Sequence, residues 1–157
     1  MSSLEPKSKL WGEEDEVKVT EFELQLWRVF YGFLRWQEEC EKSANETLLS
    51  GNELAILHAV RIKNRSKTIT DIERLLNRDD VHNIRYSLNK LLKLGLIKKS
   101  LSNYNSKNYL FEVTEAGIKD TDNFLKLRKS ILINMFKELN IDMDDMTKNL
   151  TKIKAIF

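Results

Sequence analysis

The sequence contains little cysteine, proline or glycine, and each shortage limits the kind of fold it can adopt. Its 157 residues include one Cys, one Pro and five Gly. Because the lone Cys40 cannot form an intrachain disulfide, the chain lacks the disulfide framework of small secreted domains, and this composition is typical of a cytoplasmic protein. The scarcity of residues that interrupt helices predicts a mainly α-helical chain.

Long hydrophobic runs are also missing. No stretch of about 18 uncharged apolar residues is present, so we expect no transmembrane helix and no membrane partner. The first residues, which we expect to form a flexible tail over 1–16, include no apolar segment of the kind that secretory signals contain. The hydrophobic fraction of 41% and the charged fraction of 32% are typical of a globular protein with a substantial core.

Patterns typical of enzymes and metal sites are absent as well. The two histidines, His58 and His82, fall in different predicted helices without a Cys or acidic cluster at ligand spacing, so we expect no metal and no other cofactor. The sequence shows neither a Ser/His/Asp arrangement nor a Gly-rich phosphate loop. We therefore expect a protein that is not an enzyme.

The charge is distributed unevenly along the chain. The net charge is only +2, but residues 61–109 contain twelve Lys or Arg and four acids. The rest of the chain contains fourteen basic and twenty acidic residues, so a basic centre of net +8 lies between ends of net −6. A basic segment of this kind is typical of a surface that binds nucleic acid.

The stretch 80–95, with the sequence DVHNIRYSLNKLLKLG, predicts a helix with two different faces. Its apolar residues recur at helical spacing, and its other face is rich in hydrogen-bond donors. We expect Asp80 to cap the helix through its side chain and Gly95 to end it. No acid follows Asp80 in this helix. An acid-free, donor-rich face is what a helix needs to contact base edges in a major groove, although a solvated surface helix would also fit.

The flanking sequence favours a winged helix-turn-helix over about residues 48–114. Ser50 with Glu53 and Thr70 with Glu73 are spaced as capping boxes, which predicts helices over about 51–63 and from Thr70 to about residue 77. After Gly95 the hydrophobic period changes to two, which predicts strands over 97–101 and 109–113 with a polar turn between them.

Long helices are predicted on both sides of this unit, over about 17–43, 115–139 and 143–156. From Leu26 to Trp36 the first helix is apolar nearly all round, so it must be buried on more than one side. A second copy of the chain is the simplest partner. We expect these residues to take part in dimerisation: Leu26, Trp27, Phe30, Phe33, Leu132, Phe136, Leu150 and Ile153.

This order of elements resembles the MarR family of winged helix-turn-helix transcription regulators. The matching stretches are LLSGNELAILHAVRI at 48–62, TITDIERLL at 68–76, IRYSLNKLLKLGLIKK at 84–99 and FEVTEAG at 111–117. The resemblance implies one MarR-like domain over 17–157, mainly α with a small β-hairpin wing, in which long dimerisation helices flank the winged helix-turn-helix. It also implies a homodimer bound to double-stranded DNA, with its recognition helices in successive major grooves.

The resemblance assigns roles to residues on the helix and the wing. We expect His82, Asn83, Arg85, Tyr86 and Asn89 to contact base edges. We expect Lys90, Lys93, Lys98, Lys99 and Lys107 to contact the DNA backbone. Many family members carry Asp-x-Arg in the wing, whereas the tip here is NYNSK at 103–107, which puts minor-groove contact in doubt. A winged-helix adaptor that binds proteins rather than DNA is the alternative.

Two further properties of the family bear on single residues. Members often bind a small-molecule effector beside the dimer helices, and Trp27, Phe30, Tyr31 and Trp36 either line such a pocket or belong to the core. Related regulators use a lone cysteine as a redox sensor, but the acids around Cys40 would raise the pKa of its thiol and so disfavour that role. The sequence does not identify the operator.

Overall fold

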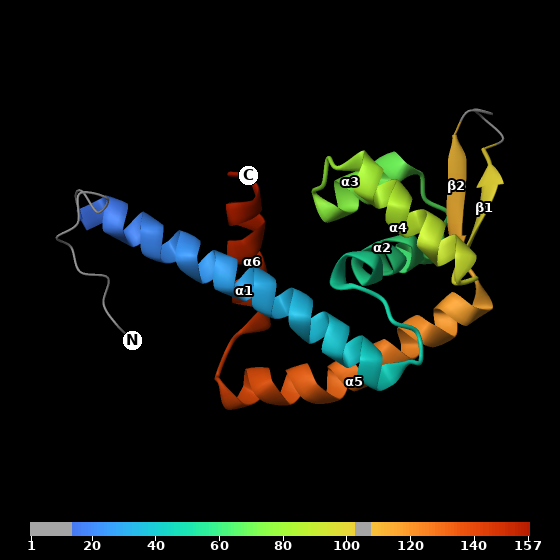
Figure 1. Ribbon diagram of the computed structural model, residues 1–157. Coiled ribbons are helices and arrows are strands. Elements are labelled where there is room, and N and C mark those ends of the chain that lie inside the picture. The colour runs from blue at the N-terminus through green and yellow to red at the C-terminus, as the bar shows by residue number, and fades with distance from the viewer. Residues whose placement is uncertain (1–13, 103–107) are drawn as a thin grey trace.

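The computed structural model describes residues 14–102 and 108–157 and shows a mainly helical chain with one β-hairpin (Figure 1). The predicted fold class and order of elements are confirmed. The elements are α1 (Glu14–Ala44), α2 (Gly51–Arg61), a 3-10 turn (Ile62–Asn64), α3 (Ile69–Leu76), α4 (Val81–Lys93), β1 (Ile97–Leu101), β2 (Tyr109–Val113), α5 (Glu115–Glu138) and α6 (Met143–Lys154).

Helix α1 begins earlier than predicted. Residues 14–16, which we assigned to the tail, form its first turn. All three are acids, and negative side chains are favoured at the amino end of a helix, where backbone N–H groups are unpaired. Trp11 and the rest of the predicted tail lie outside the described residues.

The start of α2 follows the prediction, whereas the start of α3 does not. Ser50 and Glu53 form the predicted capping box, with Ser50 N–H donating to Glu53 Oε2 over 2.8 Å. At α3 the box consists of Thr68 and Asp71 rather than Thr70 and Glu73, so the helix begins two residues earlier than expected. Backbone pairing explains the shift, because Lys67 N–H and C=O both bond to Phe111 and hold the chain extended up to Thr68.

The core lies between α2, α3, α4, the hairpin and the adjoining halves of α1 and α5. Its buried apolar members are Cys40, Leu49, Leu54, Ile56, Leu57, Ala59, Val60, Ile72, Ile84, Leu88, Leu91, Leu96, Ile97, Phe111 and Phe124. Lys67 is buried beside this core, where its Nζ donates to the carbonyl oxygens of Ile62 at 2.5 Å and Arg65 at 2.6 Å. These bonds fix the loop between α2 and α3, because a buried ammonium group needs its hydrogen-bond partners.

The hairpin forms the wing and leads directly into α5. Strands β1 and β2 are antiparallel, with Ile97 opposite Val113 and Leu101 opposite Tyr109. The Thr114 side chain accepts from Gly117 N–H and so caps α5. Gly117 lies so close to the preceding chain that a Cβ atom there would overlap the carbonyl oxygen of Leu96.

Helices α1, α5 and α6 lie outside the winged helix-turn-helix, and the first part of α1 projects well beyond it (Figure 1). Of the predicted dimerisation residues, Trp27 is 58% exposed, and Phe30, Phe33 and Leu150 are also exposed. The half-buried members are Leu26, Leu132, Phe136 and Ile153. Within 14–102 and 108–157, the helices are too short or too polar to span a membrane.

Candidate nucleic-acid interface

The turn between α3 and α4 sets the angle at which α4 is presented. Helix α3 ends at Asn77, whose φ of 52° lies in the left-handed region that Asn tolerates better than most residues. Arg78 then pairs with Asp80, with Nε to Oδ1 at 2.7 Å and Nη2 to Oδ2 at 2.5 Å. This bidentate contact links Arg78 in the turn to Asp80, the residue immediately before α4.

The prediction that the Asp80 side chain caps α4 is wrong. Asp80 stands at the capping position, but its carboxylate bonds to Arg78 and to the Asn83 side chain and makes no capping bond to the backbone. The physical reason is that a charged bidentate pair is stronger than a bond to a single N–H. The hydrogen bond from Arg78 is the main cause that lowers the pKa of Asp80 to about 2, so the pair stays ionised at neutral pH.

Helix α4 has the two faces that its sequence predicts. Ile84, Ser87, Leu88 and Leu91 are buried against the core. The predicted base-contacting residues are all exposed: His82, Asn83, Arg85, Tyr86 and Asn89. The Tyr86 side chain is 71% exposed. The arrangement leaves a continuous polar surface available to a ligand as large as a duplex.

A groove separates α4 from the wing. One hollow of about 320 Å³ is lined by Thr68, Ile69, Thr70, Glu73, Val81, Arg85, Asn108 and Tyr109. A second of about 150 Å³ is lined by Ile69, Arg85, Leu88, Asn89, Leu92, Lys99, Tyr109 and Phe111. Arg85 and Tyr109 line both hollows, so the two form one groove. Lys99 Nζ lies 4.8 Å from the centre of the Tyr109 ring, which places a cation at the edge of this groove.

The sequence analysis missed the part that Tyr109 plays in the groove. Strand alternation contained the signal, because Tyr109 lies two residues before the core residue Phe111 and therefore on the same face of the hairpin. Thr70 was predicted only as a capping residue, and Thr68 was named only within the matching stretch 68–76. The structure also places them beside Arg85, at the start of α3.

The five lysines predicted to contact the DNA backbone differ in their surroundings. Lys90 pairs with Glu53 at 2.7 Å, and Lys98 pairs with Glu112 at 3.3 Å. Lys93 is exposed at the end of α4, and Lys99 lines the groove. Lys107 lies outside the described residues. The structure therefore brings Lys99 together with the predicted base-contacting residues, whereas the amines of Lys90 and Lys98 are engaged by acids.

The Lys90 pair also affects the start of α2. Burial tends to raise the pKa of Glu53, but the bonds from Lys90 and Ser50 outweigh it and lower the pKa below its ordinary value. The Glu53 carboxylate therefore accepts hydrogen bonds from both Lys90 and Ser50, and so connects α4 to the start of α2.

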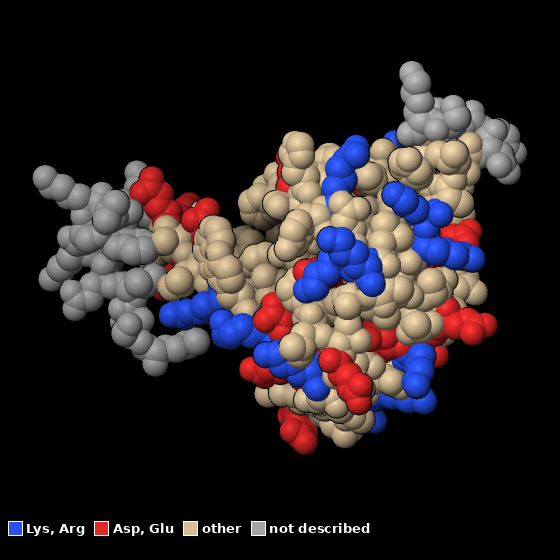
Figure 2. All heavy atoms as spheres, turned by 45° about the vertical axis from the view of Figure 1, so that its right-hand side comes forward, with Lys and Arg blue, Asp and Glu red and all other residues tan. Residues whose placement is uncertain are grey.

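The surface charge seen from the hairpin side is mixed. Figure 2 shows Lys and Arg side chains spread over the upper part of this face, whereas acidic side chains are more numerous in its lower part. The basic segment 61–109 includes α3, α4 and β1, and its residues Arg85 and Lys99 line the groove. A mixed surface of this kind suits a duplex held by a limited number of phosphate contacts.

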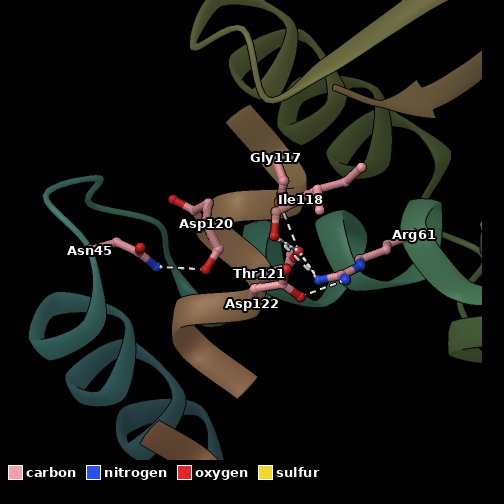
Figure 3. A network of polar contacts seen from close by, with 7 residues as sticks. All are labelled: Asn45, Arg61, Gly117, Ile118, Asp120, Thr121 and Asp122. Atoms are coloured by element: carbon pink, nitrogen blue, oxygen red, sulfur yellow. Dashed lines mark hydrogen bonds and ion pairs between the residues drawn. The ribbon is translucent and has the colours of Figure 1, made fainter. Parts of the chain in front are cut away.

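Polar contacts on α5 fix the winged helix relative to the long helices. Arg61, at the end of α2, bonds to Asp122 through Nη2 at 2.6 Å and to the Thr121 hydroxyl through Nη1 (Figure 3). On another side of α5, Asn45 Nδ2 donates to the backbone oxygen of Asp120 at 3.0 Å. Helix α5 is thus held by α2 and by the end of α1 within the same turn.

Cys40 is buried and His58 is half-buried. Burial first, and then Glu39, raises the pKa of the Cys40 thiol, which agrees with the expectation that its acidic neighbours oppose a reactive thiolate. Burial, together with Arg128 and Arg61, lowers the pKa of His58 to about 4, so this imidazole is neutral at physiological pH.

Comparisons with known proteins agree with this geometry. Residues 49–117 match the model of the family described as the winged helix DNA-binding domain. No curated protein matches the sequence. Among solved structures, the transcriptional regulator BldR from Sulfolobus solfataricus is similar with a TM-score of 0.70 and 14% identity, over 93% of this chain and 100% of that chain.

Two further structures connect the fold to a family. A MarR mutant from E. coli complexed with operator DNA is similar with a TM-score of 0.66 and 13% identity, over 89% of this chain and 96% of that one. A transcriptional regulator of the MarR family from Rhodococcus sp. RHA1 is similar with a TM-score of 0.68 and 15% identity, over 88% and 93%. The predicted resemblance is confirmed at the level of the fold: the chain has the fold of the MarR-family regulators, and its residues 49–117 match the winged helix DNA-binding domain.

Proposed function

We propose that the protein is a cytoplasmic transcription regulator that binds double-stranded DNA sequence-specifically, as a homodimer on an inverted repeat. The single observation that carries the proposal is the exposed polar face of α4 beside the groove to the wing. Arg85 and Asn89 lie on this face and line the groove, and Arg and Asn are the side chains that pair best with guanine and adenine.

The arrangement supports base contacts by α4 and backbone contacts in the groove between α4 and the wing. With α4 in a major groove, His82, Arg85, Tyr86 and Asn89 would face base edges. The groove between α4 and the wing would then take one phosphodiester strand, with Lys99 at its edge. Asn83 donates to Asp80 at 3.1 Å in the free chain, so its predicted contact with a base requires that this bond be exchanged.

The exposed apolar side chains of α1 and α6 support a dimer. Trp27, Phe30 and Phe33 on α1, like Leu150 on α6, are each at least half exposed, which is costly unless another surface covers them. A two-fold dimer presents two α4 helices, so we expect half-site centres about 10 base pairs apart. An effector that binds beside these aromatic residues remains a prediction.

The test begins by selecting bound duplexes from a random pool. Arg85→Ala and Asn89→Ala are then titrated with the selected site and with a scrambled duplex over a salt series. We expect each change to lower the preference for the selected site by about 1–3 kcal/mol and to preserve most of the binding to scrambled DNA.

Arg74→Ala is the matched control, because Arg74 is an exposed arginine of α3 that does not line the groove between α4 and the wing. It removes the same charge and should leave the preference unchanged. Equal losses on both duplexes for Arg85→Ala and Asn89→Ala would show that α4 does not contact bases specifically. No binding even at low ionic strength would favour the adaptor alternative.

A further inference from the structure

Two carboxyl groups meet inside the protein where α1 packs on α5. Glu41 is fully buried near the end of α1, and Asp120 is 6% exposed on α5. Their side chains are within hydrogen-bonding reach of each other. Asn45 Nδ2 donates to both Glu41 oxygens at 3.2 Å and to the Asp120 backbone oxygen at 3.0 Å, so one amide connects both residues.

The donors around this pair are too few for two carboxylates. Asp120 Oδ1 is buried without a hydrogen-bond partner, although the Thr47 hydroxyl serves the Asp120 side chain. Two ionised carboxylates in contact would repel each other, and neither could donate to the other. One added proton removes the repulsion and supplies the missing donor, as in other pairs of carboxyl groups that share a site.

Several charged groups on the neighbouring elements are engaged elsewhere. Glu38 accepts the Gly51 N–H at 3.0 Å, and Arg61 pairs with Asp122 on another side of α5. His58 packs on Phe124 and is neutral above its lowered pKa of about 4. Glu53 and Glu112 are paired with Lys90 and Lys98. Within 14–102 and 108–157, the ion pairs include no cation bound to Glu41 or Asp120.

We propose that Glu41 and Asp120 share one proton that holds α1 against α5, and that losing this proton as the pH rises through neutrality loosens the junction. The site is a pH-sensitive latch between the helix that bears the exposed aromatic surface and the helix that follows the wing. If the proposed function holds, loosening the latch also changes the spacing of the two α4 helices in a dimer and weakens binding to the selected DNA site.

The direction of the effect follows from linkage. Burial first, and then Asp120, raises the pKa of Glu41 from its ordinary value to about 7, and burial also raises the pKa of Asp120. A carboxyl whose pKa is higher in the folded chain than in the unfolded chain binds more protons when folded. Its stabilising contribution is complete below the ordinary value and is lost as the pH rises through about 7.

The test compares thermal unfolding of the full chain, without DNA, at pH 6 and pH 8.5. We expect the wild-type Tm to fall by roughly 5 °C over this interval relative to Glu41→Gln, which keeps the shape and a permanent donor toward Asp120. Glu39→Gln is the control, since Glu39 is an exposed carboxyl of the same helix, and it should follow the wild type. Identical pH profiles for the wild type and Glu41→Gln would overturn the proposal.

A direct titration covers the case in which Glu41→Gln does not fold. The carboxyl carbon of Glu41 is followed by ¹³C NMR in the wild-type chain and in Asp120→Asn, which gives Glu41 a permanent donor. We expect a midpoint near neutrality in the wild type and one lower by at least one pH unit in Asp120→Asn. A wild-type midpoint at the ordinary glutamate value would refute the latch. Because neither measurement uses DNA, failure of the latch and failure of the proposed function remain distinguishable.

Discussion

Two lysines on and near α4, Lys90 and Lys99, have different surroundings. Lys90 pairs with Glu53, whose side chain is only 8% exposed, whereas Lys99 lies beside Tyr109 in the groove. An amine held by a buried acid stabilises the fold, and one that faces an open groove remains available for phosphate. The two positions should therefore respond differently to the same substitution.

We expect Lys99→Ala to reduce the slope of log affinity against log salt by roughly one unit, because one phosphate contact is lost. Lys90→Ala should leave that slope nearly unchanged and lower the free energy of unfolding by roughly 1 kcal/mol, because Glu53 loses its partner. DNA titrations over a salt series and urea unfolding measure the two effects. A full unit of slope lost in Lys90→Ala would contradict the assignment.

Side-chain exposure on α4 could be predicted from the sequence, whereas the pairing of side chains in the preceding turn could not. The exposure of Arg85, Tyr86 and Asn89 follows from helical spacing alone, because each is set by its position relative to the apolar face. The pairing of Asp80 with Arg78 could not be predicted in this way. It depends on the left-handed turn at Asn77, which brings the two side chains together although capping residues usually bond to the backbone.

At the scale of one element, α3 shows how a distant strand decides a helix start. The sequence analysis placed the capping box at Thr70 and Glu73, whereas the structure has it at Thr68 and Asp71. The bonds between Lys67 and Phe111 decide in favour of Thr68. Such a contact joins residues far apart in sequence, so a local pattern cannot reveal it.

Thr68→Ala should therefore destabilise the chain by about 1 kcal/mol, which is the usual cost of losing a capping side chain. Thr70→Ala should change stability by less than about 0.5 kcal/mol, because Thr70 is exposed inside the first turn of α3. Chemical denaturation of the two variants beside the wild type measures the difference. The reverse order of stability would support the box that we first predicted at Thr70.

At the scale of the whole molecule, the apolar surface of α1 predicts self-association. Phe30→Asp places a charge within the exposed aromatic surface and should shift the chain toward the monomer at micromolar concentration, because burying that charge in an interface is costly. Lys126→Asp introduces the same group at an exposed position of α5 and should not. Sedimentation equilibrium gives the answer, and a wild-type chain that is already monomeric would contradict the proposed dimer.

The overall architecture was predictable because each element has its own periodicity and its own start signal. The hairpin strands lie where the change of period places them, and α5 spans nearly all of the helix predicted over 115–139. The meeting of Glu41 with Asp120 was not predictable, since it arises only when α1 and α5 pack together. Paired carboxyl groups from distant segments leave no local pattern in a sequence.

The contact at Gly117 determines how the hairpin and α5 are joined. The carbonyl oxygen of Leu96 occupies the space that a side chain at position 117 would need, and the Val113 side chain lies close by as well. A methyl group there would overlap this oxygen, so the hairpin and α5 could not both keep their present positions. The glycine in the VTEAG stretch is thus required for its lack of a side chain, because this lets the start of α5 lie directly against the residue that precedes the wing.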